Sequence, residues 1–267
     1  MPQQNLVLIR GGGDLATGVA QKFYRAGLRV LVLESPRPTA IRRTVALSQA
    51  VYNGHTQVED IPCRHIASVS GMDACHAAGA VPLLVDPDGN CIQNLRPTAV
   101  IDAILAKYNV GTGRHMAPIT VGLGPGFTAG QDVDAVIETM RGHNLGRLIL
   151  RGSALPNTGI PGEIGGQSRQ RVLHTPVQGV LQQLCQIGDI VTEGTPVFSV
   201  NGNVVTAPFT GLVRGLIQQG LTLPAGTKAA DIDPRTNIDV NTISDKARCL
   251  GGAALEAYYF LLRRHSQ

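Results

Sequence analysis

The stretch LVLIRGGGDLATGVAQKFYRAGLRVLVLE, residues 6–34, decides the fold. It opens with a continuous apolar run, passes through three glycines into apolar positions at helical spacing, and closes with a second apolar run that ends on Glu34. Continuous apolar runs are typical of strands buried on both faces of a parallel sheet. We therefore predict a strand, a glycine turn, an amphipathic helix and a second strand, joined by a right-handed crossover.

The same alternation continues along the first part of the chain. Residues 132–141 fit both a helix face and strand alternation, and their β-branched content favours a strand. The predicted fold class is α/β, with a Rossmann-like, mainly parallel sheet in residues 1–168. We predict further strands at residues 57–64, 81–85, 100–105, 119–123 and 147–150, and helices at residues 40–50, capped by Thr39, and 70–78.

An internal repeat defines a second domain in residues 169–235. Residues 174–200 and 206–232 follow one pattern at an offset of 32, with matched glycines such as Gly179 and Gly211. This repeat predicts a duplicated β-unit. Both copies resemble the half-motif of lipoyl and biotinyl domains, which implies a barrel-sandwich hybrid. The predicted hairpin at Asn201-Gly202 has no carrier lysine, so we expect a docking or ligand-covering module.

The C-terminal residues 236–267 carry a helical pattern. Apolar and small residues recur at helical spacing from Ala247 to Leu261, and Thr242-x-x-Asp245 has the form of a capping box. We predict that this helix packs on the first domain, which would make the β-domain an insertion.

The glycine turn is the strongest candidate site. Gly11, Gly13 and Ala16 match G-x-G-x-x-G/A, and Glu34 ends the next strand, where a ribose-binding acid belongs. Backbone N–H groups at a helix start favour an anion, although the carboxylate of Asp14 competes for the same field. Nucleotide binding and a turn kept only for packing both remain open.

A second glycine-rich loop, residues 122–126, follows a predicted strand and should face the first turn across a cleft. His143 and Asp132 are weak candidates for proton transfer. Asp132, Asp134 and Glu138 carry oxygen donors, but we predict no metal site. The predicted ligand-binding residues are Gly11, Gly12, Gly13, Asp14, Thr17, Glu34, Arg42, Arg43, Gly124 and Gly126.

Composition excludes several classes of protein. The net charge of +4 comes from scattered basic residues, and aromatic residues make up only 4% of the chain, so we expect no nucleic-acid partner. Five cysteines without a CxxC pair argue against a disulfide framework or a zinc ribbon. We see no signal peptide and no apolar run of eighteen residues, and therefore expect a cytoplasmic protein with no membrane partner.

Several segments together resemble one family. The runs IRGGGDLATGVA, PTAIRRTVALSQAV, MAPITVGLGPGFTAGQDVDAVIETMRGH, PNTGIPG, DIDPR and SDKAR closely resemble the YqeB-type accessory proteins of the selenium-dependent molybdenum hydroxylase system. The resemblance implies a role in maturing such a hydroxylase, with its apoenzyme as a partner and a nucleotide or the molybdenum cofactor (molybdopterin) as the ligand. It carries over no catalytic residues.

Two other functions compete with this one. The glycine turn with Glu34 also fits an NAD(P)-dependent oxidoreductase, and the β-domain fits a non-catalytic assembly adaptor that docks on the hydroxylase. The sequence leaves open whether the chain catalyses a reaction and whether it forms a homo-oligomer.

Overall fold

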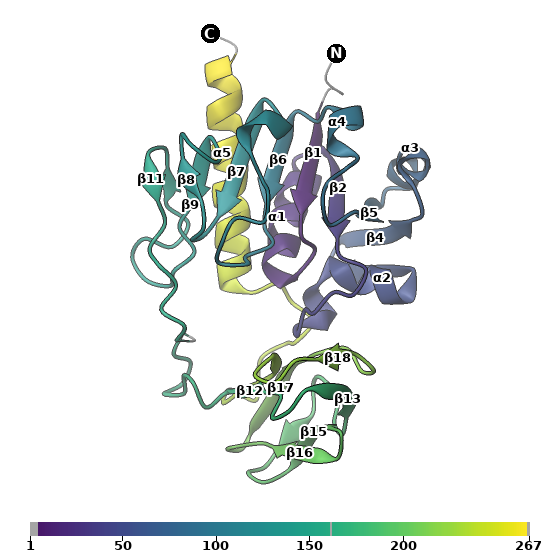
Figure 1. Ribbon diagram of the computed structural model, residues 1–267, viewed down its shortest axis with the longest axis vertical. Coiled ribbons are helices and arrows are strands. Elements are labelled where there is room, and N and C mark those ends of the chain that lie inside the picture. The colour runs from purple at the N-terminus through teal and green to yellow at the C-terminus, as the bar shows by residue number, and fades with distance from the viewer. Residues whose placement is uncertain (1–4, 161, 266–267) are drawn as a thin grey trace. The chain divides into compact units, whose positions relative to one another are not determined.

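The computed structural model describes residues 5–160 and 162–265 of the chain (Figure 1). The chain divides into two compact units. The first unit comprises Met1–Pro38, Ala46–Asn157 and Ile243–Gln267, and the second comprises Thr39–Val45 and Thr158–Thr242.

A nine-stranded sheet forms the centre of the first unit, with the strand order β10-β9-β7-β6-β1-β2-β5-β4-β3. All neighbouring strands are parallel except the two edge pairs, in which β3 and β10 run antiparallel to their partners. The predicted α/β class with a mainly parallel sheet is confirmed. The strands are β1 (Leu6–Arg10), β2 (Arg29–Glu34), β3 (His55–Val58), β4 (Ile61–Ile66), β5 (Val81–Val85), β6 (Ala99–Asp102), β7 (Ile119–Leu123), β9 (Ala135–Ile137) and β10 (Leu148–Ile149); β8 (Thr128–Ala129) pairs separately with β11 (Gly152–Ser153).

Two long helices, α1 (Asp14–Arg25) and α5 (Asp245–His265), pack together on one face of the sheet (Figure 1). Small residues allow a very close approach, because a Cβ added to Gly251 would lie 2.2 Å from the carbonyl oxygen of Gly18. The predicted apolar stripe from Ala247 to Leu261 is buried, so this part of the prediction is confirmed.

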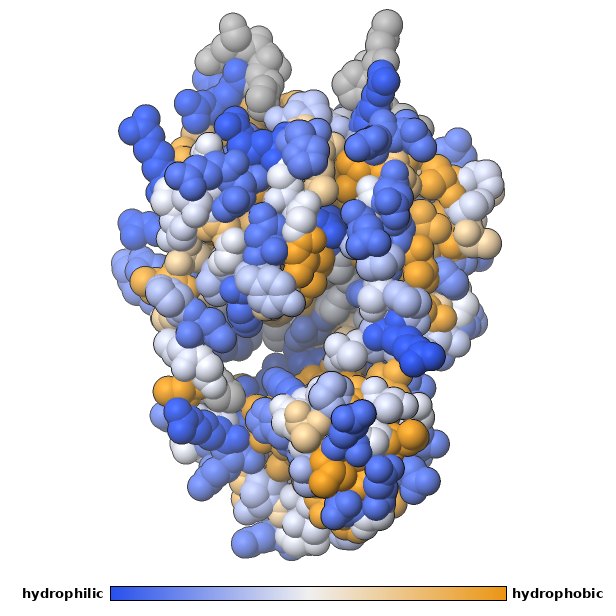
Figure 2. Space-filling model, viewed as in Figure 1, coloured by the Kyte–Doolittle hydropathy of each residue, from blue (hydrophilic) through white to orange (hydrophobic). Residues whose placement is uncertain are grey.

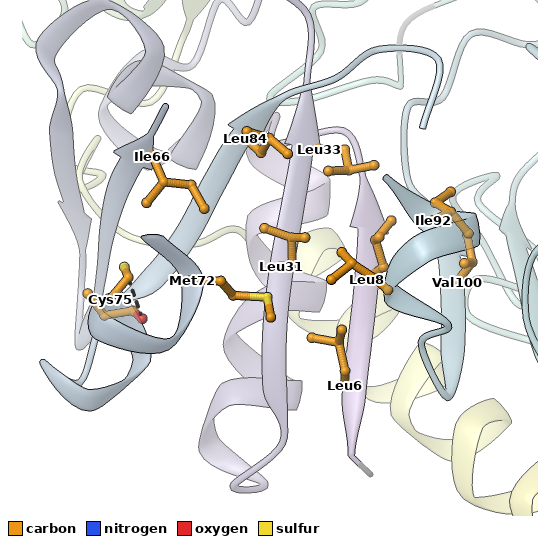
Figure 3. Packing of buried hydrophobic residues seen from close by; sticks show 12 residues of the cluster. Leu6, Leu8, Leu31, Leu33, Ile66, Met72, Cys75, Leu84, Ile92 and Val100 are labelled. Carbon is orange, nitrogen blue, oxygen red and sulfur yellow. Dashed lines mark hydrogen bonds between the residues drawn. The ribbon is translucent and has the colours of Figure 1, made fainter. Parts of the chain in front are cut away.

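Short helices cover the other face of the sheet: α3 (Met72–Ala77) and α4 (Ile92–Leu95) are each one or two turns long. The segment that ends in the one-turn α2 (Ala50–Asn53) lies beside α1 instead, because the N–H of Leu47 donates to the Thr17 hydroxyl at 3.0 Å. Figure 3 shows the core beneath α3 and α4, where Met72 lies against Leu31, and Ile92 lies near Leu8 and Val100. Alternate residues of β1 and β2 supply this core, as expected for strands that are buried on both faces.

The second unit contains two four-stranded antiparallel sheets. The strands recur at the predicted offset, since β13 (Gly179–Gln183) corresponds to β17 (Gly211–Leu216), and each sheet draws strands from both copies. Both hairpin residues, Asn201 and Gly202, have positive φ, as a type I′ turn requires. The sheets are β12 (Val172–His174), β19 (Lys228–Asp233), β17 and β14 (Ile190–Val191), and β16 (Asn203–Thr206), β15 (Pro196–Val200), β13 and β18 (Thr222–Leu223).

The helix predicted at residues 40–50 is wrong. The segment has two 3₁₀ turns, η1 (Arg43–Val45) and η2 (Leu47–Gln49), and only then the short α2. Its polar groups bond to residues far away in sequence: the carbonyl of Ile41 accepts the N–H of Leu216 at 2.7 Å, and the Thr44 hydroxyl donates to the carbonyl of Val240 at 2.6 Å. In this segment, hydrogen bonds to residues far away in the sequence replace the backbone hydrogen bonds of a helix.

Three predicted boundaries also shift. Residues 57–64 form parts of the β3–β4 hairpin rather than one strand, and the strand predicted at 100–105 ends at Asp102. The capping box at Thr242 is wrong, because α5 begins at Asp245 and the Ser244 hydroxyl accepts the N–H of Ala247 at 3.2 Å. By contrast, the strand favoured within residues 132–141 is confirmed as β9.

The surface is mixed in character. In Figure 2, hydrophilic and hydrophobic residues are intermixed over the visible face of each unit. Among the described residues, no helix is both long and apolar enough to cross a membrane.

Candidate functional site

The glycine turn at the end of β1 is held firmly by its surroundings. Gly11 has a φ of +94°, and its N–H donates to the carbonyl of Leu33 at 2.8 Å. A Cβ added to Gly11 would lie 3.0 Å from the carbonyl oxygen of Ala103. The carbonyl of Gly12 accepts the N–H of Ser48 at 2.8 Å. The first two glycines therefore have clear structural roles.

Glu34, the predicted ribose-binding acid, reaches back to the same turn. Its Oε2 accepts the N–H of Gly12 at 2.8 Å, and its Oε1 accepts the N–H of Ser35 at 2.6 Å. The carboxylate therefore ties the end of β2 to the glycine turn. Thr17 is also structural: its buried hydroxyl donates to the carbonyl of Gly13 at 2.9 Å and accepts the N–H of Leu47 at 3.0 Å.

Gly13 is different from its two neighbours. It is the N-cap residue of α1, with a φ of −66° and a ψ of −179°, a conformation open to any residue. Apart from its neighbours in the chain, none of the described residues has an atom within 4 Å of a Cβ added at this position. Neither backbone conformation nor packing within the chain requires glycine here. The open space lies over the start of α1, where the first four N–H groups have no acceptor within the helix.

A cluster of charged residues surrounds Lys246, the second residue of α5. Burial and the charges of Lys107 and Arg141 lower the pKa of Lys246, while Asp14 and Glu138 raise it by a smaller amount. Asp14 is the first residue of α1 and follows Gly13 directly in the chain. The lowered pKa indicates that the two nearby acids do not fully compensate Lys246 for its burial and for the two cations. A bound anion would supply negative charge at this point.

The packing of α1 on α5 brings this cluster together. A Cβ added to Gly18 would lie 2.4 Å from the carbonyl oxygen of Ala247, so the second turn of α1 is in close contact with the first turn of α5. α1 begins directly after Gly13, and the start of each helix carries the positive end of a helix dipole. Arg141 is oriented by Asp245, to which it donates at 2.8 and 3.1 Å.

Behind the turn, β1 and β6 end in a buried polar network. Arg10 Nη1 donates to the hydroxyl of Thr112 at 2.5 Å, and this hydroxyl donates to Asp102 Oδ2 at 2.6 Å. Burial raises the pKa of Asp102 even though hydrogen bonds from Thr112 and Ile104 and the charge of Arg10 act in the opposite direction. The network fixes the connection between β6 and β7, which carries Lys107.

The second glycine loop lies at the end of β7, which is separated from β1 by β6. A Cβ added to Gly126 would lie 2.6 Å from the Cα of Tyr108, and one added to Gly124 would lie 2.6 Å from the hydroxyl of Thr139. The β6–β7 connection contacts both glycine turns, Gly11 through Ile104 and Gly126 through Tyr108. Gly124 and Gly126 thus have packing roles.

The other predicted site residues lie elsewhere. Arg42 and Arg43 belong to the second unit, where they donate to the carbonyls of Thr242 at 3.3 Å and Leu216 at 2.7 Å. Asp132 closes its own turn by accepting the N–H of Thr128 at 2.7 Å, and His143 is exposed in the β9–β10 connection.

The acids considered as metal donors have protein partners. Asp134 accepts from Thr120 and Arg114, and both oxygens of Glu138 accept backbone N–H groups. Within residues 5–160 and 162–265, no group of three or more His, Cys, Asp or Glu side chains is arranged to hold a metal ion.

Sequence reasoning missed Lys246, Lys107 and the Arg10–Asp102 pair. The charged ends of two buried apolar strands were a usable signal for Arg10 and Asp102, since an ion in such a strand needs a partner. Lys107 and Lys246 come together only through the packing of α5 and the β6–β7 connection, which leaves no local pattern.

The strand order β5-β2-β1-β6-β7-β9 is that of a doubly wound α/β protein, and the glycine turn lies beside the point where the order reverses between β1 and β6. In such folds, ligands bind at the carboxyl ends of the strands, beside the point where the strand order reverses.

The sequence is 46% identical over 260 residues to Uncharacterized protein YqeB of Escherichia coli (strain K12), covering 97% of this chain and 48% of that protein. The chain thus spans about half the length of the curated relative that it matches, and the similarity supports a relationship to YqeB.

Other comparisons add little. No family model matches the sequence. A succinylglutamate desuccinylase from Silicibacter sp. TM1040 aligns at 13% identity and a TM-score of 0.24, covering 87% of this chain and 85% of that chain. The ectoine utilization protein EutE (DoeB) from Ruegeria pomeroyi aligns at 12% identity and a TM-score of 0.27, covering 85% of each. At such TM-scores neither likeness bears on the fold or function of this chain.

Proposed function

We propose that the first unit binds a phosphate group of a nucleotide or nucleotide-bearing cofactor at the start of α1. We further propose that the chain acts as an accessory protein in maturing a selenium-dependent molybdenum hydroxylase. The binding proposal is carried by Gly13. The maturation proposal is supported by the family resemblance of the sequence motifs, and the similarity to YqeB accords with that resemblance.

Gly13 supports binding because neither its backbone conformation nor a packed neighbour among the described residues requires glycine at this N-cap position. The residue has an ordinary φ, and an added Cβ would meet no atom within 4 Å. In dinucleotide-binding turns, the second glycine of the fingerprint leaves the backbone open for the approach of a pyrophosphate. Gly13 occupies that position in Gly11-x-Gly13-x-x-Ala16.

The charges around the turn suit an anion. Lys246 is the second residue of α5, and burial together with the charges of Lys107 and Arg141 lowers its pKa. A phosphate placed over Gly13 would face two helix dipoles and this lysine. Asp14 would repel a phosphate, so the ligand must approach from the Lys246 side of the turn.

An NAD(P)-dependent oxidoreductase is the second candidate function. The strand order and the position of Glu34 at the end of β2 favour it, since an acid at this place holds a ribose in dinucleotide-binding proteins. In the chain as it stands, Glu34 already accepts the N–H of Gly12 and Ser35, so a ribose would have to share the carboxylate with both.

Calorimetric titration of the purified, reduced protein would test the binding proposal. ATP, GTP, CTP, NADH and NADPH would be compared, and native mass spectrometry would search the untreated protein for a retained nucleotide or pterin. A retained pterin nucleotide would support a maturation role, and tight binding of NADH or NADPH alone would favour the oxidoreductase. If none of these ligands is retained or bound at millimolar concentration, the proposal is wrong.

A pair of variants makes this test specific for the site. Lys246→Gln should weaken nucleotide binding about tenfold or more, because a hydrogen bond to a charged group contributes about 1.5–3 kcal/mol. Arg263→Gln removes a charge from the far, exposed end of the same helix and should leave the affinity unchanged. Equal effects of the two changes would indicate a nonspecific charge effect.

A further inference from the structure

A cavity of about 730 Å³ opens in the first unit on the face of the sheet that carries α4. Its volume falls within the range of roughly 300–1,000 Å³ that is usual for small-molecule sites. None of its lining residues belongs to the glycine turn or to the Lys246 cluster. The lining residues are Asp88, Gly89, Asn90, Ile92, Gln93, Arg96, Pro97, His115, Met116, Ala117 and Pro118.

The cavity exists because two neighbouring crossovers carry little helix. The β5–β6 crossover contains only the four-residue α4, and the β6–β7 crossover contains only the 3₁₀ turn η4 (Arg114–Met116). The opposite face of the sheet is covered by helices of 12 and 21 residues. Parallel sheets are normally covered on both faces, so thin cover on one face leaves room for another molecule.

The lining combines an apolar floor with a polar rim. Ile92 is buried against the sheet core near Leu8 and Val100 (Figure 3), and Met116 packs against the same core. Arg96 and His115 are exposed at the rim. A molecule with an apolar body and a polar or charged end matches this arrangement.

Arg96 stands out by its backbone conformation. It follows the last residue of α4 with φ +47° and ψ +61°, the left-handed conformation in which helices usually place glycine or asparagine. A long, charged residue is unfavourable there, and strained residues cluster at ligand sites. Since Arg96 is one of the residues that line the cavity, binding of a ligand by its guanidinium would explain why arginine stands at this position.

The turn before α4, which supplies part of the lining, is held by hydrogen bonds. Asp86 accepts the N–H groups of Asn90 at 3.0 Å and Cys91 at 2.9 Å, which fixes the turn before α4. Behind this turn, the buried Arg10 has its Nε 3.9 Å from the position of a Cβ on Gly89, and this Nε has no hydrogen-bond partner among the described residues. Asp88 is the one acid among the lining residues.

We infer that this cavity is a second ligand site, which binds a small organic anion with an apolar or aromatic body. The guanidinium of Arg96 contacts the anionic group, and Ile92, Met116 and Pro97 contact the body. The inference rests on the cavity and its residues and is independent of ligand binding at the glycine turn.

A fluorescence titration tests it, with 8-anilinonaphthalene-1-sulfonate as the probe, an aromatic sulfonate of this class. The chain has no tryptophan, so Gln93→Trp would place a single reporter in the cavity wall. We expect saturable energy transfer from this tryptophan to one bound probe molecule. Tyr259→Trp, on the exposed side of α5, is the control and should show weaker transfer at the same probe concentration, because α5 lies on the opposite face of the sheet from the cavity.

Two changes at Arg96 separate function from folding. Arg96→Gln in the Gln93→Trp background should weaken probe binding at least tenfold. Arg96→Gly should weaken binding equally while raising the melting temperature, because glycine suits the left-handed conformation. Lys246→Gln should leave probe binding unchanged. Unaltered affinity in both Arg96 variants, or transfer that is no stronger in Gln93→Trp than in the Tyr259→Trp control, would overturn the inference.

Discussion

Replacing Gly13 by alanine separates a ligand-binding turn from a turn that serves packing alone. If the glycine is present only for the fold, alanine should have no effect on binding. If it keeps the start of α1 open for a phosphate, alanine should leave the fold intact and reduce binding. Gly13 is suited to this test because its φ of −66° is ordinary and the added Cβ meets no atom within 4 Å.

The expected effect on stability is small. Alanine at an unstrained glycine position reduces the entropy of the unfolded chain and stabilises by about 0.4–1 kcal/mol. Alanine is also a poorer N-cap than glycine, which costs on the order of 0.5–1 kcal/mol. These two effects nearly cancel, so the free energy of unfolding should change by less than about 1 kcal/mol.

The expected effect on binding is much larger. The new methyl group would occupy the space through which a phosphate approaches the backbone N–H groups of α1. Loss of one hydrogen bond to a charged group costs about 1.5–3 kcal/mol, which corresponds to a dissociation constant roughly 10-fold to 100-fold higher. Calorimetry with the tightest-binding nucleotide measures this change, and urea denaturation measures stability on the same samples.

Gly11→Ala is the matched contrast. Gly11 has a φ of +94°, and an added Cβ would lie 3.0 Å from backbone atoms of Ala103 and Ile104, so alanine should destabilise the fold by about 2 kcal/mol or more. Full retention of nucleotide affinity in Gly13→Ala would refute the proposed role of this residue. Strong destabilisation by Gly13→Ala would refute the stability estimate as well.

Three further changes test other parts of the first unit. Thr112→Val removes the hydroxyl that joins the buried guanidinium of β1 to the buried carboxylate of β6, and chemical denaturation should show a loss of about 2–4 kcal/mol. Gly251→Ala places a Cβ 2.2 Å from an α1 carbonyl oxygen and should lower the free energy of unfolding by at least about 2 kcal/mol. In the control Gly252→Ala, the new Cβ contacts none of the described residues, and the free energy of unfolding should rise by about 0.5–1 kcal/mol. Similar melting temperatures of the two variants would contradict this packing. The pKa of Lys246 is lowered, so the folded protein loses this proton at a pH below lysine's usual pKa of 10.5. As the pH rises through that range, anion affinity should fall, whereas the stability of the ligand-free protein should rise because the unfolded chain binds more protons than the folded chain. Both trends should be absent in Lys246→Gln.

The parallel sheet could be predicted from the sequence because its strands are short, continuous apolar runs between turn residues. Val81–Val85 and Ile119–Leu123 were predicted to the residue, since burial on both faces leaves little room for polar side chains. The segment after Pro38 was mispredicted as a helix because its partners, Leu216 and Val240, are more than 170 residues away. Helix propensity depends on the local sequence alone and contains no information about a hydrogen bond to a distant segment of the chain.

The candidate site was predicted only in part for the same reason. Gly13 and Asp14 were found because a motif on one strand and one helix carries them. Arg42 and Arg43 were selected for their closeness in sequence to Glu34, yet they bond within the second unit. Lys246 was missed because its place depends on the contact between α1 and α5, which the small-residue stripe indicates only as a close approach.

The hydrogen bonds of the glycine turn also limit what it can bind. The N–H of Gly11 is taken by Leu33, and the N–H of Gly12 is taken by Glu34, so donors for a ligand begin at Gly13. A pyrophosphate laid along the whole turn would have to displace the Glu34 carboxylate, which also holds Ser35. One phosphate over Gly13, facing Lys246, requires no such displacement. We therefore expect the protein to recognise a single phosphate at α1, with the rest of the ligand extending away from β2.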